Sequence, residues 1–414
     1  MIYKGGKAIS SLYYGGGRLG SLWARGGRLW PGSLAGTGGG ILGTGGGTSG
    51  GGTVGTGGGI LGTGGGTSGG GTSGGGTGGE WYDPNERPDY HFTAEQIAAN
   101  TPGEMEWTVS IPSDKYYFAM GRLFEKVTDE YPEIEIDWGD KSKIEQFNIS
   151  VINPAPSHTY AKAGTYYITI KGAFRFGRGD GSNSPSLRDC LTSIVTQTDN
   201  SPICDLAPYA FSHLEHLTYI SPALLIKCSY TKNFDYCFSN CKRLTSVPPF
   251  FNCLAAESFF RCFEYCSNLA RPHEYLFAYS PNAKSFEQCF YYAGIVVLPA
   301  TLFRWNTKAQ NFNSCFAWNQ QLSSIPQGFF DANIAALDFG SCFMQCTGLR
   351  TAPEDLFTPC RSARDFSQTF LYCNLLAHIP PVWNTHPNAA HQYYASAATA
   401  ADNWAEAYEK GWTS

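Results

Sequence analysis

Charged side chains are scarce in this chain of 414 residues: they make up 15% of it, whereas about 25% is usual for a globular protein. Basic residues are not in excess either, since 29 Lys and Arg stand against 34 Asp and Glu and the formal net charge is −5. Proteins that bind nucleic acid usually carry a basic stripe that displaces counterions from phosphates. The charge balance therefore argues against a nucleic-acid partner.

Long apolar runs are also missing. A membrane-spanning helix needs about 20 consecutive apolar residues, and no segment supplies them, so we expect no membrane span. The first ten residues, Met1–Ser10, lack the apolar stretch of about 7–15 residues that is typical of a secretory signal. We therefore expect that the chain is not exported by the usual route.

Aromatic residues, in contrast, reach 15%, and glycine occurs 49 times. Few charges combined with many Tyr, Phe and Trp suit a surface that meets a partner or a sugar. The histidines keep no fixed position, and no pair of acidic residues stands out as acid and base. We expect no enzyme, no catalytic residue, no cofactor and no metal site.

Residues 1–35 follow a ten-residue rhythm in which Tyr3, Tyr13 and Trp23 each precede a glycine-rich turn and a basic residue. Glycine supplies the positive φ that tight hairpins need, so the rhythm predicts strand–turn–strand units. Hairpins of this size cannot bury enough surface to be stable alone. We expect an anchor or oligomerisation segment, with a frayed terminus as the alternative.

Residues 36–79 consist mainly of Gly, Thr and Ser, and Gly36–Val54 repeats as Gly55–Ser73 with only the last residue changed. A flexible linker is the default interpretation, and a stem of polyglycine helices packed in a trimer is the alternative. Residues 80–103 form a polar connector. A homo-oligomer is expected, with a trimer favoured.

Alternating side chains predict strands within residues 104–178. Five residues there, Trp138, Gly139, Asp140, His158 and Tyr160, resemble the signature of PKD-type β-sandwich domains. One departure is Lys141, which stands where that family usually has glycine. The resemblance implies a β-sandwich in which Trp138 fills the core, Asp140 closes a turn and Tyr160 is a corner residue. Such a module is a spacer or a contact domain more than a catalyst.

From about residue 184 the sequence repeats every 25 to 27 residues. Two Phe columns four residues apart suit one face of a short helix, and a Leu column suits a short strand. Stacked units would bury these columns in a continuous core. The core residues are expected to include Phe238, Phe263, Phe290, Phe316, Phe343, Phe370, Leu244, Leu269, Leu322, Leu349 and Leu376. The expected fold of residues 184–414 is an α/β solenoid of about eight layers with a C-terminal cap.

The repeat pattern F-x-x-C-F-x-x-C-x-x-L-x-x-x-P, as in Phe234–Pro248 and Phe339–Pro353, resembles the BspA-like leucine-rich repeat family. The resemblance implies a solenoid of the leucine-rich-repeat type, with a role in surface attachment and host contact. All 14 cysteines lie between Cys190 and Cys373, many of them in this pattern. Disulfides or metal sites are one interpretation, but a ladder of buried thiols is favoured because the second Cys is missing in some units.

The N-terminal rhythm also resembles the starts of structural proteins from bacteriophages of gut bacteria. We therefore expect a non-enzymatic tail or fibre component, assembled in the host cytoplasm and located on the virion. Its residues 1–79 would contact other virion proteins, and its repeats would bind a bacterial surface glycan or protein. The alternatives are a BspA-like adhesin on a bacterial cell surface and, third, a depolymerase of surface glycans.

Candidate contact residues are aromatic residues outside or beside the Phe columns, whose planes can stack on sugars or on a protein patch. These candidates are Tyr291, Tyr292, Trp305, Trp318, Tyr372 and Trp383. The alternative is that they simply pack at the edges of the repeats.

Overall fold

The computed structural model describes residues 101–414, apart from residues 122, 151–154, 178, 181–182 and 197–199. Before residue 101 it describes Ala98 and six short strands between residues 2 and 29. The glycine-rich segment 36–79 and most of the connector 80–103 lie outside the described residues. The chain divides into two compact units, Met1–Asp89 and Tyr90–Ser414, and each is described by itself.

Three antiparallel hairpins make up the described part of the first unit. They are β1 (Ile2–Lys4) with β2 (Lys7–Ile9), β3 (Tyr13–Tyr14) with β4 (Gly17–Arg18), and β5 (Leu22–Ala24) with β6 (Gly27–Leu29). The ladders pair Tyr3 with Ala8, Tyr13 with Arg18 and Trp23 with Arg28, so every hairpin has the same register relative to the ten-residue rhythm. The predicted strand–turn–strand units are confirmed.

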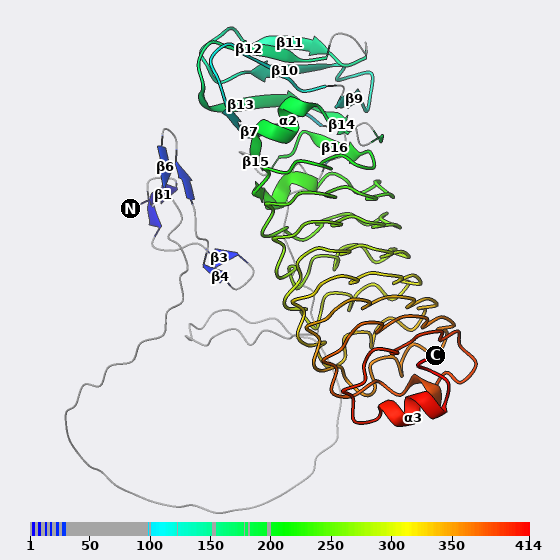
Figure 1. Ribbon diagram of the computed structural model, residues 1–414. Coiled ribbons are helices and arrows are strands. Elements are labelled where there is room, and N and C mark those ends of the chain that lie inside the picture. Colours follow the sequence, from blue (N-terminus) through cyan, green and yellow to red (C-terminus); the bar gives the residue numbers. More distant parts are fainter. Residues whose placement is uncertain are drawn as a thin grey trace, which may run out of the picture. The chain divides into compact units, whose positions relative to one another are not determined.

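The second unit begins with a six-stranded sheet in the order β11–β10–β13–β7–β15–β17 (Figure 1). At its centre β7 and β13 pair antiparallel over their full length. Two smaller sheets have the orders β12–β8 and β16–β14–β9. The strands of the large sheet are β7 (Gly103–Ile111), β10 (Glu133–Asp137), β11 (Glu145–Asn148), β13 (Gly164–Gly172), β15 (Leu191–Thr196) and β17 (Tyr219–Ile220). Those of the smaller sheets are β8 (Tyr116–Ala119), β9 (Phe124–Lys126), β12 (Ser157–Tyr160), β14 (Phe174–Phe176) and β16 (Ile203–Leu206).

The Trp-Gly-Asp motif forms a packed turn at the end of β10. Trp138 is buried, its ring stacks on His158 at 5.1 Å, and its carbonyl accepts a hydrogen bond of 2.9 Å from the Tyr160 hydroxyl. His158 Nε2 lies 2.8 Å from Asp140 Oδ2. Gly139 has a φ of 77°, and a Cβ there would lie 2.4 Å from the Tyr167 carbonyl oxygen, so only glycine fits. The side chains of the motif therefore contact one another within the turn.

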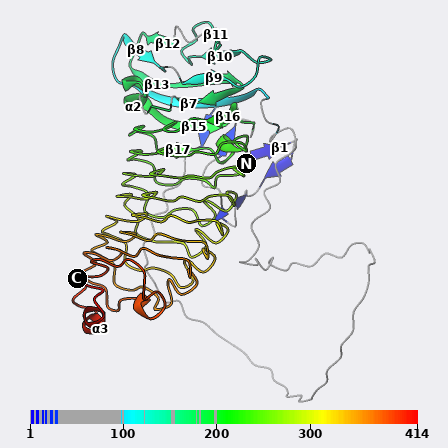
Figure 2. The same cartoon turned by 90° about the vertical axis from the view of Figure 1, so that its right-hand side faces the viewer.

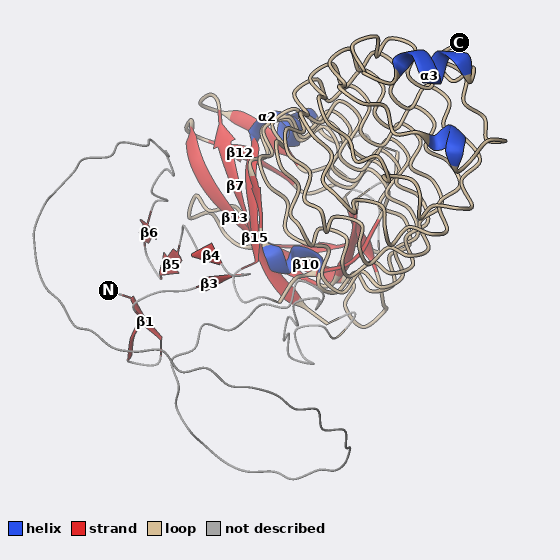
Figure 3. Cartoon of the chain, turned by 90° about the horizontal axis from the view of Figure 1, so that it is seen from below, coloured by secondary structure: helices blue, strands red, loops and turns tan. Residues whose placement is uncertain are grey.

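The repeats do not form an α/β solenoid, so that prediction was wrong. In the described residues α-helix is limited to α2 (Pro185–Cys190) and α3 (Trp404–Glu409), with single 3₁₀ turns at η1 (Pro222–Leu225) and η2 (Val382–Asn384). The rest of the repeats consists mainly of turns. Parallel bridges of one residue pair, such as that between Asn233 and Ser258, connect these turns from one layer to the next. In Figure 3 the layers of the repeats are drawn mostly as loops and turns (tan), and strands (red) are seen only in the sheets. The short strand expected at the Leu column is also missing from the described residues.

Left-handed backbone conformations explain why no helix forms. In each F-x-x-C motif the residue before the Cys position has a positive φ, for example 55° at Tyr236 and 61° at Asn240. A right-handed helix needs φ near −63° at every residue, so it cannot pass through such a position. The N–H groups of Phe234, Tyr236 and Phe238 donate instead to carbonyls of the next layer at 2.8–2.9 Å. The N–H of Cys237 closes a turn onto the Phe234 carbonyl at 3.1 Å.

Figure 2 shows the backbone of the repeats as a series of layers. Phenylalanine rings stack from layer to layer inside this framework. In the second Phe column the ring centres of Phe263, Phe290 and Phe316 are 5.4 Å apart. The sequence analysis missed a further ladder, whose ring centres are 5.8–6.2 Å apart: Phe250, Phe277, Phe303, Phe330 and Phe357. The Phe and Leu residues expected in the core are all buried.

All 14 cysteines are buried and none of them is in a disulfide bond, so the predicted ladder of thiols is confirmed. Cys241 and Cys346 donate to carbonyls of the preceding layer at 3.1 and 3.2 Å. Where the cysteine is replaced, Asn319 fills the position and donates to the Phe290 carbonyl at 2.8 Å. Burial raises the pKa of Cys266 and Cys346 to about 12, so these thiols stay protonated at neutral pH and are poor nucleophiles and metal ligands.

The left-handed positions give a direct test of the layer structure. Gln345 has a φ of 62°, and that conformation costs about 1–2 kcal/mol for a residue with a Cβ. We expect Gln345→Gly to exceed Gln345→Ala in free energy of unfolding by about 1 kcal/mol, as measured by urea denaturation. In a helix the order would be reversed, with glycine about 1 kcal/mol worse than alanine. The same two substitutions at Gln310, an exposed residue without positive φ, are the control and should not favour glycine.

Candidate binding face

The surface of the repeats combines constant and variable positions. The inward Phe, Cys and Leu positions hardly change between layers, but the two left-handed positions before the cysteines do. The first position is Tyr209, Tyr236 and Arg261 in three successive layers, Gln or Ser in the next four, and Tyr393 in the last. The second position is Tyr265, Tyr292 and Trp318 in three successive layers. This local group of aromatic residues is therefore a candidate binding surface.

Arg261 lies at the centre of the group. Its guanidinium carbon is 5.6 Å from the ring centre of Tyr236 and 5.2 Å from that of Phe260, which is within the range of cation–π attraction. Tyr209 stacks on Tyr236 with ring centres 4.3 Å apart, and Phe260 meets Tyr236 edge-on at 5.2 Å. The cation and three rings therefore form one connected cluster.

A second set of rings continues from this cluster. Tyr265 is 38% exposed, and its ring centre lies 5.9 Å from Tyr291 and 5.6 Å from Tyr292. Tyr292 is 43% exposed and lies 6.2 Å from Trp318. We call the whole group the aromatic face, which consists of Tyr209, Tyr236, Phe260, Arg261, Glu264, Tyr265, Tyr291, Tyr292 and Trp318.

Glu264 supplies a carboxylate at the floor of the aromatic face. Its side chain is 8% exposed, its Oε1 lies 3.5 Å from an Arg261 nitrogen, and its Oε2 accepts a hydrogen bond of 3.4 Å from the Ser239 hydroxyl. Burial raises the pKa of Glu264, and Arg261 and Ser239 offset this only in part. Within the described residues the buried Nε of Arg261 has no hydrogen-bond partner. The Arg261 side chain is 33% exposed, so a buried carboxylate here contacts a partly exposed cation. A carboxylate with a raised pKa beside a specific charge marks a candidate functional site.

The structure brings together three of the six predicted contact residues: Tyr291, Tyr292 and Trp318. Tyr372 is exposed in the same column, but Gln345 separates it from Trp318. Trp305 packs against Tyr275 at 5.4 Å, outside the aromatic face. Trp383 is buried, donates from Nε1 to Glu406 at 2.9 Å and packs on Trp412, so it belongs to the C-terminal end of the repeats.

Sequence reasoning missed six members of the aromatic face: Tyr209, Tyr236, Phe260, Arg261, Glu264 and Tyr265. A comparison of the residues directly before each Cys position would have found Tyr236, Arg261 and Tyr265, because the aromatic and basic residues there belong to neighbouring units. Their clustering depends on the stacking of the layers.

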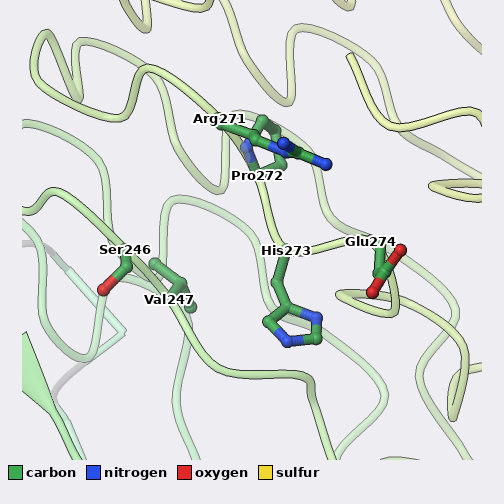
Figure 4. A pocket seen from close by; sticks show the side chains of 6 residues that line it. All are labelled: Ser246, Val247, Arg271, Pro272, His273 and Glu274. Atoms are coloured by element: carbon green, nitrogen blue, oxygen red, sulfur yellow. The ribbon is translucent and has the colours of Figure 1, made fainter. Parts of the chain in front are cut away.

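A pocket of about 280 Å³ lies elsewhere on the repeats and is lined by Ser246, Val247, Arg271, Pro272, His273 and Glu274 (Figure 4). His273 Nδ1 accepts a hydrogen bond of 3.1 Å from the N–H of Tyr275, and burial together with Arg271 lowers the pKa of His273. Ser246 points away from His273 in Figure 4. His273 is therefore not placed to act as a base on the Ser246 hydroxyl group, and the pocket does not resemble a nucleophilic site.

Two searches of the described residues bear on other types of site. No described helix is both long enough and apolar enough to cross a bilayer. No group of three or more His, Cys, Asp or Glu in the same part of the chain is arranged to hold a metal ion.

Comparisons of the chain with protein-family models, with curated proteins and with solved structures find no match. The resemblances to PKD-type domains and to BspA-like repeats therefore stay predictions.

The buried carboxylate of the aromatic face predicts a dependence of stability on pH. The pKa of Glu264 in the folded chain lies above its ordinary value of 4.5, so the folded state is disfavoured as the pH rises from 4.5 through that higher pKa. We expect Glu264→Gln to be more stable than the wild type at pH 7, and the difference to shrink below pH 4.5, as measured by urea denaturation. Glu274→Gln, at an exposed residue outside the face, is the matched control. A Glu264→Gln variant less stable than the wild type at pH 7 would contradict this.

Proposed function

We propose that this chain is a non-enzymatic attachment protein that binds a receptor on a bacterial surface through the aromatic face. The observation that carries the proposal is the group of three outward aromatic residues in successive layers, next to the partly exposed Arg261 and the buried Glu264. Exposed Tyr and Trp bring large contact areas at a low cost in side-chain entropy, and Arg adds polar specificity. Residues of these types dominate the energy of most binding surfaces.

Binding is favoured over hydrolysis because Glu264 is the one carboxylate that belongs to the aromatic face. The two carboxylates beside the face, Asp235 and Glu287, accept hydrogen bonds from Ser258 and Asn311 of the repeats. Cleavage of a glycosidic bond normally needs two carboxyl groups about 5–10 Å apart, one as acid and one as base or nucleophile. A role as a depolymerase has no comparable support in this face.

We further propose that the protein is a tail or fibre component of a bacteriophage virion, with the first unit on the assembly side. The support comes from the hairpins between residues 2 and 29, since isolated two-stranded hairpins are marginal in water and need a partner. Other virion proteins or further copies of this chain would provide it. An adhesin on a bacterial cell surface is the alternative, and it would use the same aromatic face.

Adsorption of the fluorescently labelled full chain to a panel of gut bacterial strains tests the proposal. We expect saturable binding to some strains, and a loss of about tenfold or more in affinity for Trp318→Ala and for Tyr292→Ala, because both remove central aromatic contacts. The control is Tyr230→Ala, which removes a 76% exposed aromatic residue outside the aromatic face and should bind like the wild type. Equal binding by all three variants, or no binding to any strain, would contradict the proposed function.

A further inference from the structure

We infer that the ligand of the aromatic face is a neutral glycan in an extended conformation, which lies along the direction of stacking with one sugar ring per layer. This inference rests on the proposed function and names the chemical class of its receptor.

The spacing of the rings supports a ligand with a repeat. Tyr265, Tyr292 and Trp318 present one ring per layer, with ring centres 5.6 and 6.2 Å apart. The buried Phe ladder beneath them fixes the layer spacing, because Phe263, Phe290 and Phe316 stack at 5.4 Å. These distances are close to the length of one sugar ring in an extended glycan. A chain of sugars can therefore place one ring over each of three layers.

The backbone under the aromatic face argues against an extended peptide. A peptide that adds to a strand edge needs free N–H and C=O groups. The N–H groups of Tyr265, Tyr292 and Trp318 all donate to carbonyls of the next layer at 2.8–2.9 Å. The ligand must therefore be recognised by side chains, and the C–H face of a sugar ring can stack on an aromatic plane without any backbone partner.

The polar centre of the face suits hydroxyl groups. Glu264 is a largely buried acceptor, and Arg261 is a donor whose side chain is 33% exposed. Sugar hydroxyls can donate to a carboxylate and accept from a guanidinium, because each hydroxyl does both.

The charge around the face disfavours an acidic polymer. Asp235 and Glu287 lie in the layers of Tyr236 and Tyr292, next to the outward positions, and Glu264 lies between them. Against these three carboxylates the face has one cation, Arg261, which already contacts Glu264 and two rings. A polyanion would meet repulsion, whereas a neutral glycan would not.

Affinity electrophoresis of the full chain tests the inference. The gels contain mixed-linkage β-glucan, hydroxyethyl cellulose, galactomannan or dextran as neutral polymers, and polygalacturonate or hyaluronate as acidic ones. We expect retardation by at least one neutral polymer and by neither acidic one. Trp318→Ala should weaken the retardation about tenfold, and Tyr230→Ala should leave it unchanged. Retardation by the acidic polymers alone, or by none of the neutral ones, would overturn the inference.

Titration with oligosaccharides cut from the retarding polymer tests the register. One ring per layer over three layers predicts that affinity rises steeply from the monosaccharide to the trisaccharide. A monosaccharide that binds as tightly as the trisaccharide would overturn the alignment along the stack.

Treatment of the bacteria separates this inference from the proposed function. Periodate cleaves the vicinal diols of glycans, so it should abolish adsorption of the full chain, and protease treatment of the cells should not. If protease abolishes adsorption and periodate does not, the chain is an attachment protein with a protein receptor and the glycan inference fails. If untreated cells bind no chain and no polymer retards it, both fail.

Discussion

The stacking of phenylalanine rings between layers is the interaction on which the repeat region depends. Each buried Phe contributes about 1.5–3 kcal/mol of hydrophobic stabilisation, but a single layer exposes both faces of its rings and cannot be stable alone. Three ladders continue this contact through successive layers, for example from Phe259 to Phe286 at 5.5 Å and from Phe277 to Phe303 at 5.8 Å. The backbone adapts to the same spacing, because alternate N–H groups donate to the next layer.

The spacing of the aromatic face follows from this layer spacing through the residues with positive φ. A positive φ before each Cys position turns the backbone so that Phe and Cys point inward while the residue before Cys points outward. The outward residues therefore repeat at the distance that the rings inside impose. Inward positions are restricted to shapes that fit the stack, such as Cys or its replacements Asn319 and Thr369. Outward positions are free to vary, and the aromatic face occurs where they carry Tyr, Trp and Arg.

The sequence was sufficient to predict the repeat period, the buried Phe and thiol columns and the N-terminal hairpins. It did not allow the turns to be told from a helix, because Phe residues four apart fit both one face of a helix and a pair of consecutive four-residue turns. The usual markers of positive φ are Gly and Asn, but these positions hold Tyr236, Arg261 and Gln288. Only the tertiary hydrogen bonds between layers hold such residues in the left-handed region.

The candidate site could be predicted only in part, because it too depends on contacts between layers. Tyr291, Tyr292 and Trp318 are aromatic residues beside a Phe column, and that pattern is visible in the sequence. Trp305 and Trp383 have the same appearance, but the packing of the polypeptide outside the Phe columns places them away from the face. Glu264 has no such signal in the sequence, because its importance comes from its burial and from its contact with Arg261.

A crystal structure of the full chain with a neutral oligosaccharide, taken from the polymer that retards it most, is the most direct measurement. The layer spacing predicts sugar rings over Tyr265, Tyr292 and Trp318 in successive layers, with hydroxyl groups on Glu264 and Arg261. An oligosaccharide bound across a single layer, or in the pocket beside His273, would contradict the claim that the stacking of the layers sets the spacing of the binding surface.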